Sequence, residues 1–481
     1  MQDIEIASAL EPYADYYLAS EETEGGYGWY YTSAFGRLAA DPGISTEEFG
    51  KDIISSYDQF NTVLHNGESV SNMTLSLVDL TMVKPAYEKL REIFTKTDTA
   101  LKADQRDFAE FGLAAMNSYS FVNDLQLDVV DLLDKLEDTD LDDTICTEEE
   151  LADAANAIKA CVVYRNRSTA EGINGMSVAF PYKSIKYYGD TRQELNNLKL
   201  DSQTELFNDV FSVIAVQKKA EHENRPPSKY GRIGEFIDNL VYIDYTKEDW
   251  YVKGFEDYEP TTTLVDIPVT DTGEGYSIQL PDKTWDIIAD CVTVVYQKTA
   301  DGSLRYLGFD HFGDDDADGH PMVDMDDRWV HINDKLVCYE DNGSIETEDG
   351  TVFTGEVKAK LNDEGEILIH VQWDAASDSA DGVETGHVTG YDFVNDELAF
   401  TKKGTQKFKT GDRIEFLFDY YDEEGNLIET KPAGSLRVTT MEKLKVEDRA
   451  LEDCDIQFLG RLTDAYQRQL LTEIIEAHIG D

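Results

Sequence analysis

One spacing of carboxylates in the sequence could bind a divalent cation. The run DDDADG ends at Gly319 and places acids at alternate positions, which are Asp314, Asp316 and Asp318. A calcium loop begins this way, with alternate carboxylates around one ion and a glycine at the sharp turn. Met325 stands at the twelfth position, where a bidentate carboxylate is expected, although an aspartate flanks it on each side. Calcium binding and a solvated acidic hairpin both fit this run.

The thiols and imidazoles are dispersed rather than clustered. The five cysteines never form a CxxC pair, and the eight histidines are equally scattered, whereas a structural zinc site needs clustered ligands. A nucleophilic Cys146 or Cys161 is one interpretation, but free cysteine is among the most buried residue types, which favours core thiols. His65 is the only histidine before residue 217. No cysteine stands at a recognisable spacing from it, so a surface histidine is expected.

Strand-like and helix-like segments alternate through residues 1–216, which predicts a mixed α/β domain. The short apolar run YYLAS, Tyr16 to Ser20, predicts a buried strand. Helices are expected from Thr46, over residues 83–94 and over residues 125–136, because apolar side chains recur on one helical face. The acidic run 136–150 predicts an exposed connection before another helix. The stretch NGMSVAFPY, from Asn174, predicts a strand that ends at an edge.

From about residue 230 the apolar period shortens to two. A helix near residues 204–217 gives way to a polar stretch with two adjacent prolines, which predicts a linker over 217–229. Strand-like runs then alternate with Asp-Gly, Glu-Gly and Asn-Gly turns, as in antiparallel hairpins. Residues 230–481 are therefore expected to form an antiparallel β domain, a sandwich or a barrel, closed by a helix over residues 463–479.

Composition narrows the classes of partner. Lys and Arg number 42 against 98 Asp and Glu, so the net charge is −56. Such a chain repels nucleic acid and anionic membranes, and we expect neither as a partner. No apolar run is long enough to span a bilayer, and the first thirty residues lack the sections of a signal peptide.

Several motifs resemble the clostripain family of cysteine peptidases. The family carries a D-A-C-L-M stretch followed by a helix, a strand ending in A-S-E-E and a loop with G-W-x-Y. Similar elements here are Ala19–Ser20–Glu21–Glu22 and Gly28–Trp29–Tyr30–Tyr31. Two later stretches, TLSLVDL from Thr74 and NGMSVAFPY from Asn174, are also similar to the family's pattern, with Ala179 where tyrosine is usual. The resemblance covers residues 1–185 closely and is loose beyond the linker.

The resemblance implies a partial caspase-like fold, with a largely parallel or mixed sheet flanked by helices, and cysteine endopeptidase activity, commonly after basic residues. If Met1 is the methionine of D-A-C-L-M, the nucleophilic cysteine and its histidine are encoded upstream. We therefore expect no catalytic residue within this chain, which would be an inactive fragment alone. The missing segment could act as a separate polypeptide partner, and the expected substrate is a peptide or protein, with no required cofactor.

The part of such an enzyme that remains here is one wall of the substrate cleft. Because ligands bind at strand ends and the loops beyond them in open α/β sheets, the candidates are Ser20, Glu21, Glu22 and Trp29. Glu21 or Glu22 could pair with a basic substrate side chain. The competing interpretation places both glutamates on the solvated surface and makes Trp29 a core anchor.

Two classes of function stay open. One is a clostripain-like endopeptidase, which by resemblance is bacterial and extracellular or on the cell surface in its full-length form. The other is a non-catalytic protein that binds a peptide, glycan or surface partner through a remnant peptidase scaffold and a β domain.

Overall fold

The computed structural model describes residues 3–22, 24, 28–64, 74–121, 124–138, 146–166, 172–224, 243–255, 265–347, 350–362, 364–373, 385–394 and 406–480. The chain divides into two compact units. The first comprises residues 1–219, 244–259 and 465–467, and the second comprises residues 220–243, 260–464 and 468–481.

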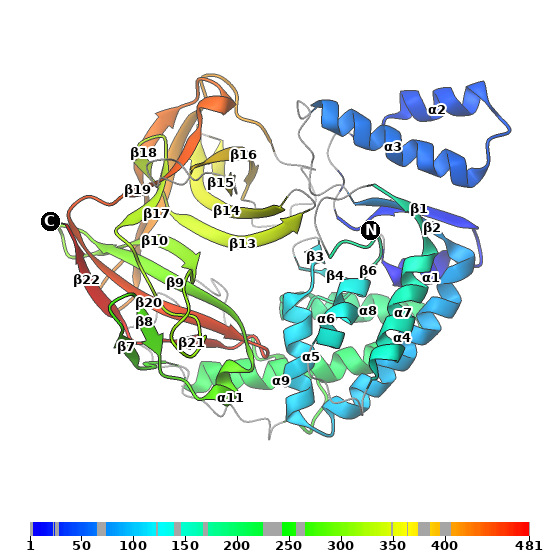
Figure 1. Cartoon of the computed structure of the whole chain (residues 1–481), viewed down its shortest axis with the longest axis horizontal. Helices are drawn as coiled ribbons and strands as arrows, with labels where there is room; N and C mark the ends of the chain where they lie inside the picture. Colours follow the sequence, from blue (N-terminus) through cyan, green and yellow to red (C-terminus); the bar gives the residue numbers. More distant parts are fainter. Residues whose placement is uncertain are drawn as a thin grey trace. The chain divides into compact units, whose positions relative to one another are not determined.

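The first unit is built of helices around two small sheets (Figure 1). Its strands are β1 (Tyr16–Ser20), β2 (Leu75–Asp79), β3 (Ser120–Phe121), β4 (Gln126–Asp128), β5 (Val162–Arg165) and β6 (Ser177–Val178). Its helices are α1 (Ile4–Leu10), α2 (Tyr31–Ala40), α3 (Thr46–Leu64), α4 (Leu80–Leu101), α5 (Gln105–Asn117), α6 (Val129–Asp138), α7 (Glu148–Cys161), α8 (Tyr188–Leu198) and α9 (Asp201–Asn224), whose last residues extend into the second unit.

The sheet β1–β2–β5 has helices on both faces. Helix α3 packs on one face, while α4 and α7 lie on the other, with α1 against α4 (Figure 1). The core face of α4 repeats every three to four residues, as the apolar spacing predicted. Both described sheets pair their strands antiparallel, and only an isolated bridge between Asp3 and Ser177 is parallel. The described strand pairs therefore differ from the largely parallel sheet that the family resemblance implied.

Several helix boundaries follow from capping side chains. Thr147 and Glu150 form a reciprocal capping box at the start of α7. Helix α3 begins at Thr46, as expected, and Ser45 caps it because its Oγ accepts the Glu48 N–H at 3.2 Å. The expected linker also begins differently, since residues 217–224 are helical and belong to α9, while residues 225–242 lie outside the described part of the chain.

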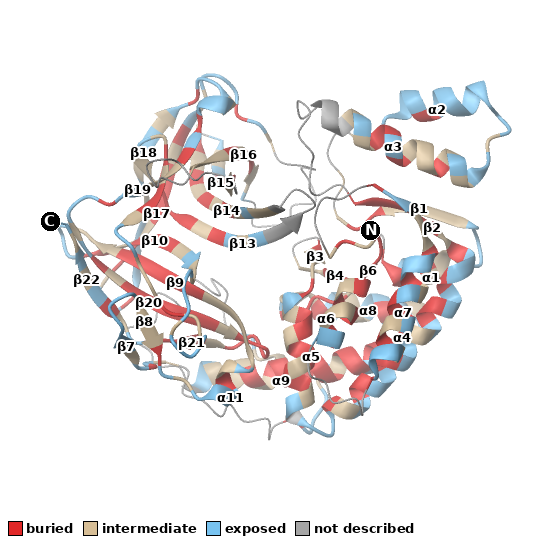
Figure 2. Ribbon diagram, in the orientation of Figure 1, coloured by how far each residue is buried: buried red, intermediate tan, exposed pale blue. Residues whose placement is uncertain are grey.

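The second unit is β-rich, as expected from the period-two pattern. Its strands are β7 (Val269–Asp271), β8 (Tyr276–Ile278), β9 (Ile288–Lys298), β10 (Leu304–His311), β11 (Arg328–Ile332), β12 (Lys335–Leu336), β13 (Tyr339–Thr347), β14 (Gly350–Leu361), β15 (Gly365–Trp373), β16 (Thr385–Phe393), β17 (Arg413–Tyr421), β18 (Leu427–Arg437), β19 (Lys445–Ala450), β20 (Cys454–Asp464), β21 (Gln469–Leu471) and β22 (Ile475–Ile479), with a short helix α11 (Asp282–Trp285). Their buried side chains form one continuous apolar core, which Figure 2 shows along the strand ribbons.

Strands β10, β13, β14 and β17 close a small barrel-like circuit, because β17 pairs with both β10 and β14. The β10–β13 pair is parallel, which the hairpin signals did not predict. Gly308 makes this approach possible: a Cβ there would lie 1.6 Å from the Tyr339 carbonyl oxygen. Its φ of +121° is also a conformation that favours glycine.

The expected C-terminal helix over residues 463–479 is wrong. The segment forms the end of β20, then β21 and β22, which pair antiparallel with β20. Gln467 adopts a positive φ of 59° in the turn between β20 and β21, and this conformation breaks a helix. Leu470 and Leu471 are both buried in this hairpin, so the apolar pairs that resembled a helical face belong to a sheet covered on both sides.

Candidate functional site

The turn after β1 is fixed to the start of β2 by one hydroxyl. Ser20, the last residue of β1, lies with its Oγ 2.8 Å from Thr74 Oγ1. The backbone N–H of Glu22 donates to the same Thr74 oxygen at 2.8 Å. Because Ser20 and Thr74 are both buried, these bonds replace water contacts that the turn would otherwise need. Thr74 therefore holds the turn over Ser20 to Glu22 in place.

Glu21 points into the protein from this turn. Its side chain is fully buried, and Oε2 accepts the backbone N–H of Gly175 at 3.0 Å. Ser76 Oγ donates to the Gly175 carbonyl at 2.8 Å, so both polar groups of this peptide segment are bound. Gly175 has a φ of +96°, and a Cβ there would press against Val162 and Ser76. Glu21 therefore does not belong to the solvated acidic surface.

Asp128 lies beside Glu21 at the end of β4. Its Oδ1 accepts the N–H groups of Val130 and Asp131 at 2.9 Å each, which caps helix α6. The backbone N–H of Asn174 donates to Asp128 Oδ2 at 2.5 Å. Burial raises the pKa of Asp128 to about 7, despite these hydrogen bonds.

Glu21 and Asp128 form a buried pair of acids. Burial, and then the neighbouring charge of Asp128, raise the pKa of Glu21 well above its ordinary value. In its ionised form Glu21 Oε1 is a buried acceptor with no donor. When Glu21 is protonated, it can donate to Asp128, and both groups are then satisfied. One proton shared between the two carboxyl groups would therefore satisfy both.

A second buried acid lies on helix α1. Glu5 Oε1 accepts the N–H of Ala179 at 3.1 Å and a bond from the Gln203 amide. Its other oxygen is buried without a partner, and burial raises the pKa of Glu5 to about 8. Asp3 caps the same helix through Ile6 N–H at 2.7 Å, and burial raises its pKa to about 6.

These contacts bring together three stretches that are far apart in sequence. The strand-end run Ala19–Ser20–Glu21–Glu22, the run from Thr74 and the run from Asn174 meet through side-chain to backbone hydrogen bonds. The buried acids lie as two pairs, Asp3 with Glu5 and Glu21 with Asp128, and we call the four together the acid cluster. Sequence reasoning selected Glu21 but missed the other three. The helix expected over residues 125–136 begins only at Val129, because Gln126–Asp128 form strand β4. The signal for Asp128 was the acid inside the apolar run LQLDVV.

Trp29 packs between α3 and the sheet. Its Nε1 donates to Glu24 Oε2 at 2.7 Å, and the half-buried ring packs against the cluster of Ile54, Tyr57, Leu75 and Leu77 between α3 and the sheet. This is the anchoring role that the competing interpretation gave to Trp29. That Ser20, Glu21, Glu22 and Trp29 line a substrate cleft stays a prediction.

The thiols of the first unit lie in environments that keep them protonated. Burial raises the pKa of Cys146, and it raises the pKa of Cys161 to about 12. Cys161 Sγ donates to the Ala157 carbonyl within its own helix. A nucleophilic cysteine needs the opposite shift, because only the thiolate attacks. His65 lies outside the described residues.

In the DDDADG run, Asp316 stabilises a tight turn. Asp316 Oδ1 accepts the N–H groups of Asp318 and His320 at 2.9 and 3.0 Å, and its Oδ2 accepts Ser277 Oγ at 2.6 Å. The Asp314 carbonyl accepts the Met322 N–H. Within the described ranges no group of three or more His, Cys, Asp or Glu side chains is placed to hold a metal ion.

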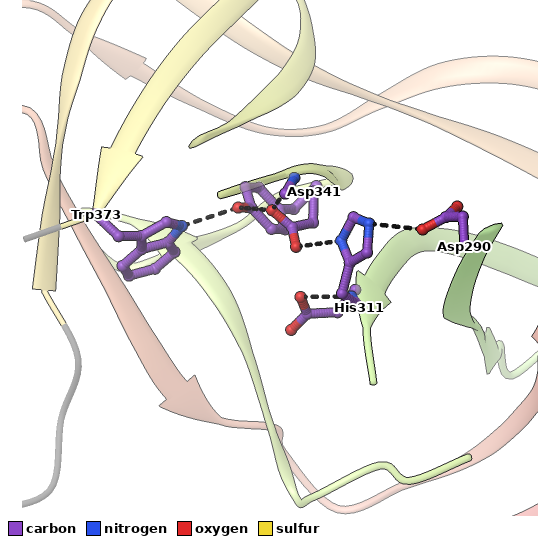
Figure 3. Close-up of polar contacts among 7 residues, drawn as sticks. Asp290, His311, Asp341 and Trp373 are labelled. Atoms are coloured by element: carbon purple, nitrogen blue, oxygen red, sulfur yellow. Dashed lines mark hydrogen bonds and ion pairs between the residues drawn. The ribbon is translucent and has the colours of Figure 1, made fainter. Parts of the chain in front are cut away.

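A polar cluster in the second unit surrounds His311 (Figure 3). His311 Nδ1 lies 2.6 Å from Asp341 Oδ2, and Nε2 lies 3.0 Å from Asp290 Oδ1. Hydrogen bonds to these carboxylates raise the pKa of His311 to about 10, although burial opposes the shift. The other oxygen of Asp341 accepts Tyr339 OH at 3.3 Å, and Trp373 Nε1 donates to the Tyr339 oxygen at 2.8 Å. We call these residues the His311 cluster.

The first unit is therefore a mixed α/β structure with buried acids at Asp3, Glu5, Glu21 and Asp128. Residues 1–224 match the model of the clostripain family, Peptidase_C11. Comparisons with curated proteins and with solved structures found no match. No helix in the described ranges is long and apolar enough to cross a bilayer.

Proposed function

We propose that this chain supplies the substrate-binding part of a clostripain-type cysteine endopeptidase. The match of residues 1–224 to the model of the clostripain family supports peptidase chemistry. In this chemistry a thiolate attacks the scissile carbonyl, and a histidine keeps the thiol ionised and protonates the leaving amine. The substrate is a peptide or protein in an extracellular or cell-surface setting.

The observation that carries the proposal is the meeting of the three family-like stretches at the end of β1. Thr74 Oγ1 bonds the Ser20 hydroxyl and the Glu22 backbone N–H, on either side of Glu21, and Glu21 binds Gly175 from the third stretch. A strand end whose loop is fixed by buried hydrogen bonds suits a rigid wall beside a reacting peptide. Glu22 is half-buried beyond this point, and we assign it to the binding of a basic substrate side chain.

The nucleophile in this proposal comes from polypeptide outside the 481 residues. Cys146 and Cys161 are the cysteines within the matched range, and burial disfavours the thiolate of each. Cys291 and Cys338 have their pKa raised by burial in the second unit, and Cys454 also belongs there. The complementing polypeptide then provides both the thiol and the histidine.

Hydrolysis of an arginyl peptide reporter tests the proposal. The 481-residue chain alone is expected to show none, whereas a form extended at its amino end by the native upstream coding sequence is expected to be active. Glu22→Gln in the extended form should lower kcat/KM for arginyl reporters by about tenfold or more, through loss of a charge-assisted pair. Glu24→Gln is the matched control. An inactive extended form that still folds would refute the proposal.

A non-catalytic binding role is the second candidate, and the buried state of the described thiols favours it. If the extended form binds arginyl peptides without hydrolysing them, this second function replaces the first. Measuring binding and hydrolysis with the same reporter peptide separates the two.

A further inference from the structure

Helix α2 carries an apolar ridge that faces solvent. Tyr31, Phe35 and Leu38 recur at helical spacing and are 58%, 60% and 36% exposed. The rings of Tyr31 and Phe35 stack with their centroids 6.0 Å apart. The buried residue of this helix is Ala34, and Figure 2 shows most of the α2 surface as exposed. We call Tyr31, Phe35 and Leu38 the α2 ridge. Such contiguous apolar exposure is a common mark of an interaction site.

The ridge is held in a fixed position rather than on a free helix. Arg37 Nε bonds Asp52 Oδ2 at 2.9 Å, which joins α2 to α3. Tyr30 stacks on Phe60 of α3 with ring centroids 4.8 Å apart. Helix α3 in turn packs on the sheet through Ile54 and Tyr57. The contacts that hold α2 in place therefore lie on the side that faces α3, and the α2 ridge faces away from α3.

The α2 ridge also continues toward the candidate site. The rings of Tyr31 and Trp29 lie with centroids 6.4 Å apart, and Trp29 bonds Glu24 just beyond Glu22. A bound segment could therefore run from the strand end of β1 along the outer face of α2.

Charge indicates what would bind there. The α2–α3 hairpin, residues 31–64, has two basic residues and five acidic ones. Both basic side chains are paired, Arg37 with Asp52 and Lys51 with Glu47. Exposed carboxylates remain at Asp41 and Glu48. Aromatic faces among such charges favour Lys or Arg, whose stems cover apolar surface while the charged ends meet carboxylates.

We propose that the α2 ridge is a docking surface for a polypeptide segment in which Lys or Arg residues alternate with apolar residues. That this segment belongs to a peptide substrate rests on the proposed function. A second copy of the chain and an anionic membrane are disfavoured occupants, because the net charge of −56 repels both.

Fluorescence anisotropy with the 481-residue protein tests this surface without any hydrolysis. The probe is a labelled peptide of alternating arginine and leucine, and the comparison peptide replaces each arginine by glutamate. We expect the arginine peptide alone to bind, and to bind more weakly as salt rises. Phe35→Ser and Tyr31→Ser should each weaken binding by about tenfold, as for central aromatic contacts. The control is Leu427→Ser with Ile428→Ser, because both side chains are exposed on β18 of the other unit.

Several results would overturn the proposal. They are no binding of the arginine peptide, equal binding of the glutamate peptide, or binding that Phe35→Ser leaves unchanged. Dimers in sedimentation that Phe35→Ser dissociates would assign the ridge to a second copy. Ridge-dependent binding to phosphatidylserine vesicles would assign it to a membrane. Because the assay needs no catalysis, its failure leaves the reporter-hydrolysis test of the proposed function intact.

Discussion

Glu21 Oε2 accepts the backbone N–H of Gly175 at 3.0 Å across 154 residues of sequence. The bond joins the loop after β1 to the segment that leads into β6. It is fully buried, so neither group can exchange its partner for water without opening the first unit. This contact is the reason that Glu21 cannot act as a surface carboxylate.

Replacing Glu21 tests the shared proton directly. Glu21→Gln keeps an acceptor for Gly175 and gains an amide that can donate to Asp128, so it should preserve or raise the free energy of unfolding at pH 7. Glu21→Ala leaves the Gly175 N–H unpaired and should lower that free energy by about 2–4 kcal/mol. Urea denaturation measures both. Equal destabilisation by the two variants would argue against proton sharing.

Glu5 should make the first unit less stable as the pH rises. Because its folded pKa is about 8 and its ordinary value is 4.5, the folded chain retains a proton that the unfolded chain releases earlier. The stabilisation that goes with protonated Glu5 is complete below pH 4.5 and is lost as the pH rises through about 8. Over this range the free energy of unfolding should fall by up to about 1.4 kcal/mol per pH unit. Glu5→Gln should reduce the slope in urea titrations from pH 5 to pH 8, and the slope that remains comes from the other buried acids, such as Asp3 and Asp128. A slope identical to that of the parent chain would contradict the assignment.

The stability that the His311 cluster contributes should also fall as the pH rises, but for a different reason. Two aspartates stabilise the imidazolium, and the folded pKa of about 10 lies above the ordinary 6.5. This stabilisation is complete below pH 6.5 and declines as the pH rises through about 10. His311→Ala should cost about 2 kcal/mol near neutral pH, because Asp341 is left buried and poorly compensated. The cost should shrink by pH 10, and thermal unfolding across this range measures it. A cost independent of pH would contradict the ion-pair account.

Gly308 should tolerate no side chain. Gly308→Ala places a Cβ against the Tyr339 carbonyl, and we expect a loss of more than about 3 kcal/mol in unfolding free energy. Gly302→Ala is the matched control, since Gly302 also has a positive φ but open space around its Cβ position. That variant should lose only about 1 kcal/mol from backbone strain. Similar losses at both positions would show that the close strand approach contributes little.

The sequence predicted the elements that depend on local pattern. Helix α4 follows its apolar spacing, and the period-two runs of the second unit are strands. Strand β1 forms over the predicted run, but only Ser20 of it is buried, so the expectation of a buried strand is wrong. The run over residues 463–479 failed because a strand buried on both faces contains adjacent apolar residues that resemble a helical stripe. Gln467 has a positive φ in the turn, but a glutamine in the sequence does not indicate whether it lies in a turn or in a helix.

The candidate site was predictable only in part. Glu21 was selected because it follows a strand, but its partners depend on contacts between residues distant in sequence. Asp128 caps α6 and meets Asn174, and neither contact leaves a periodic pattern. Burial of an acid is set by tertiary packing, so its raised pKa could not be read from the residue type.

Labelling with an arginyl affinity reagent tests the central claim most directly. The reagent is a peptide chloromethyl ketone, which alkylates the nucleophilic cysteine of a competent peptidase. Mass spectrometry of the 481-residue chain is expected to show no adduct at any of the five cysteines, while the extended form is labelled once, outside these residues. A specific adduct at Cys146 or Cys161 in the 481-residue chain, blocked by competing arginyl peptide, would contradict the account.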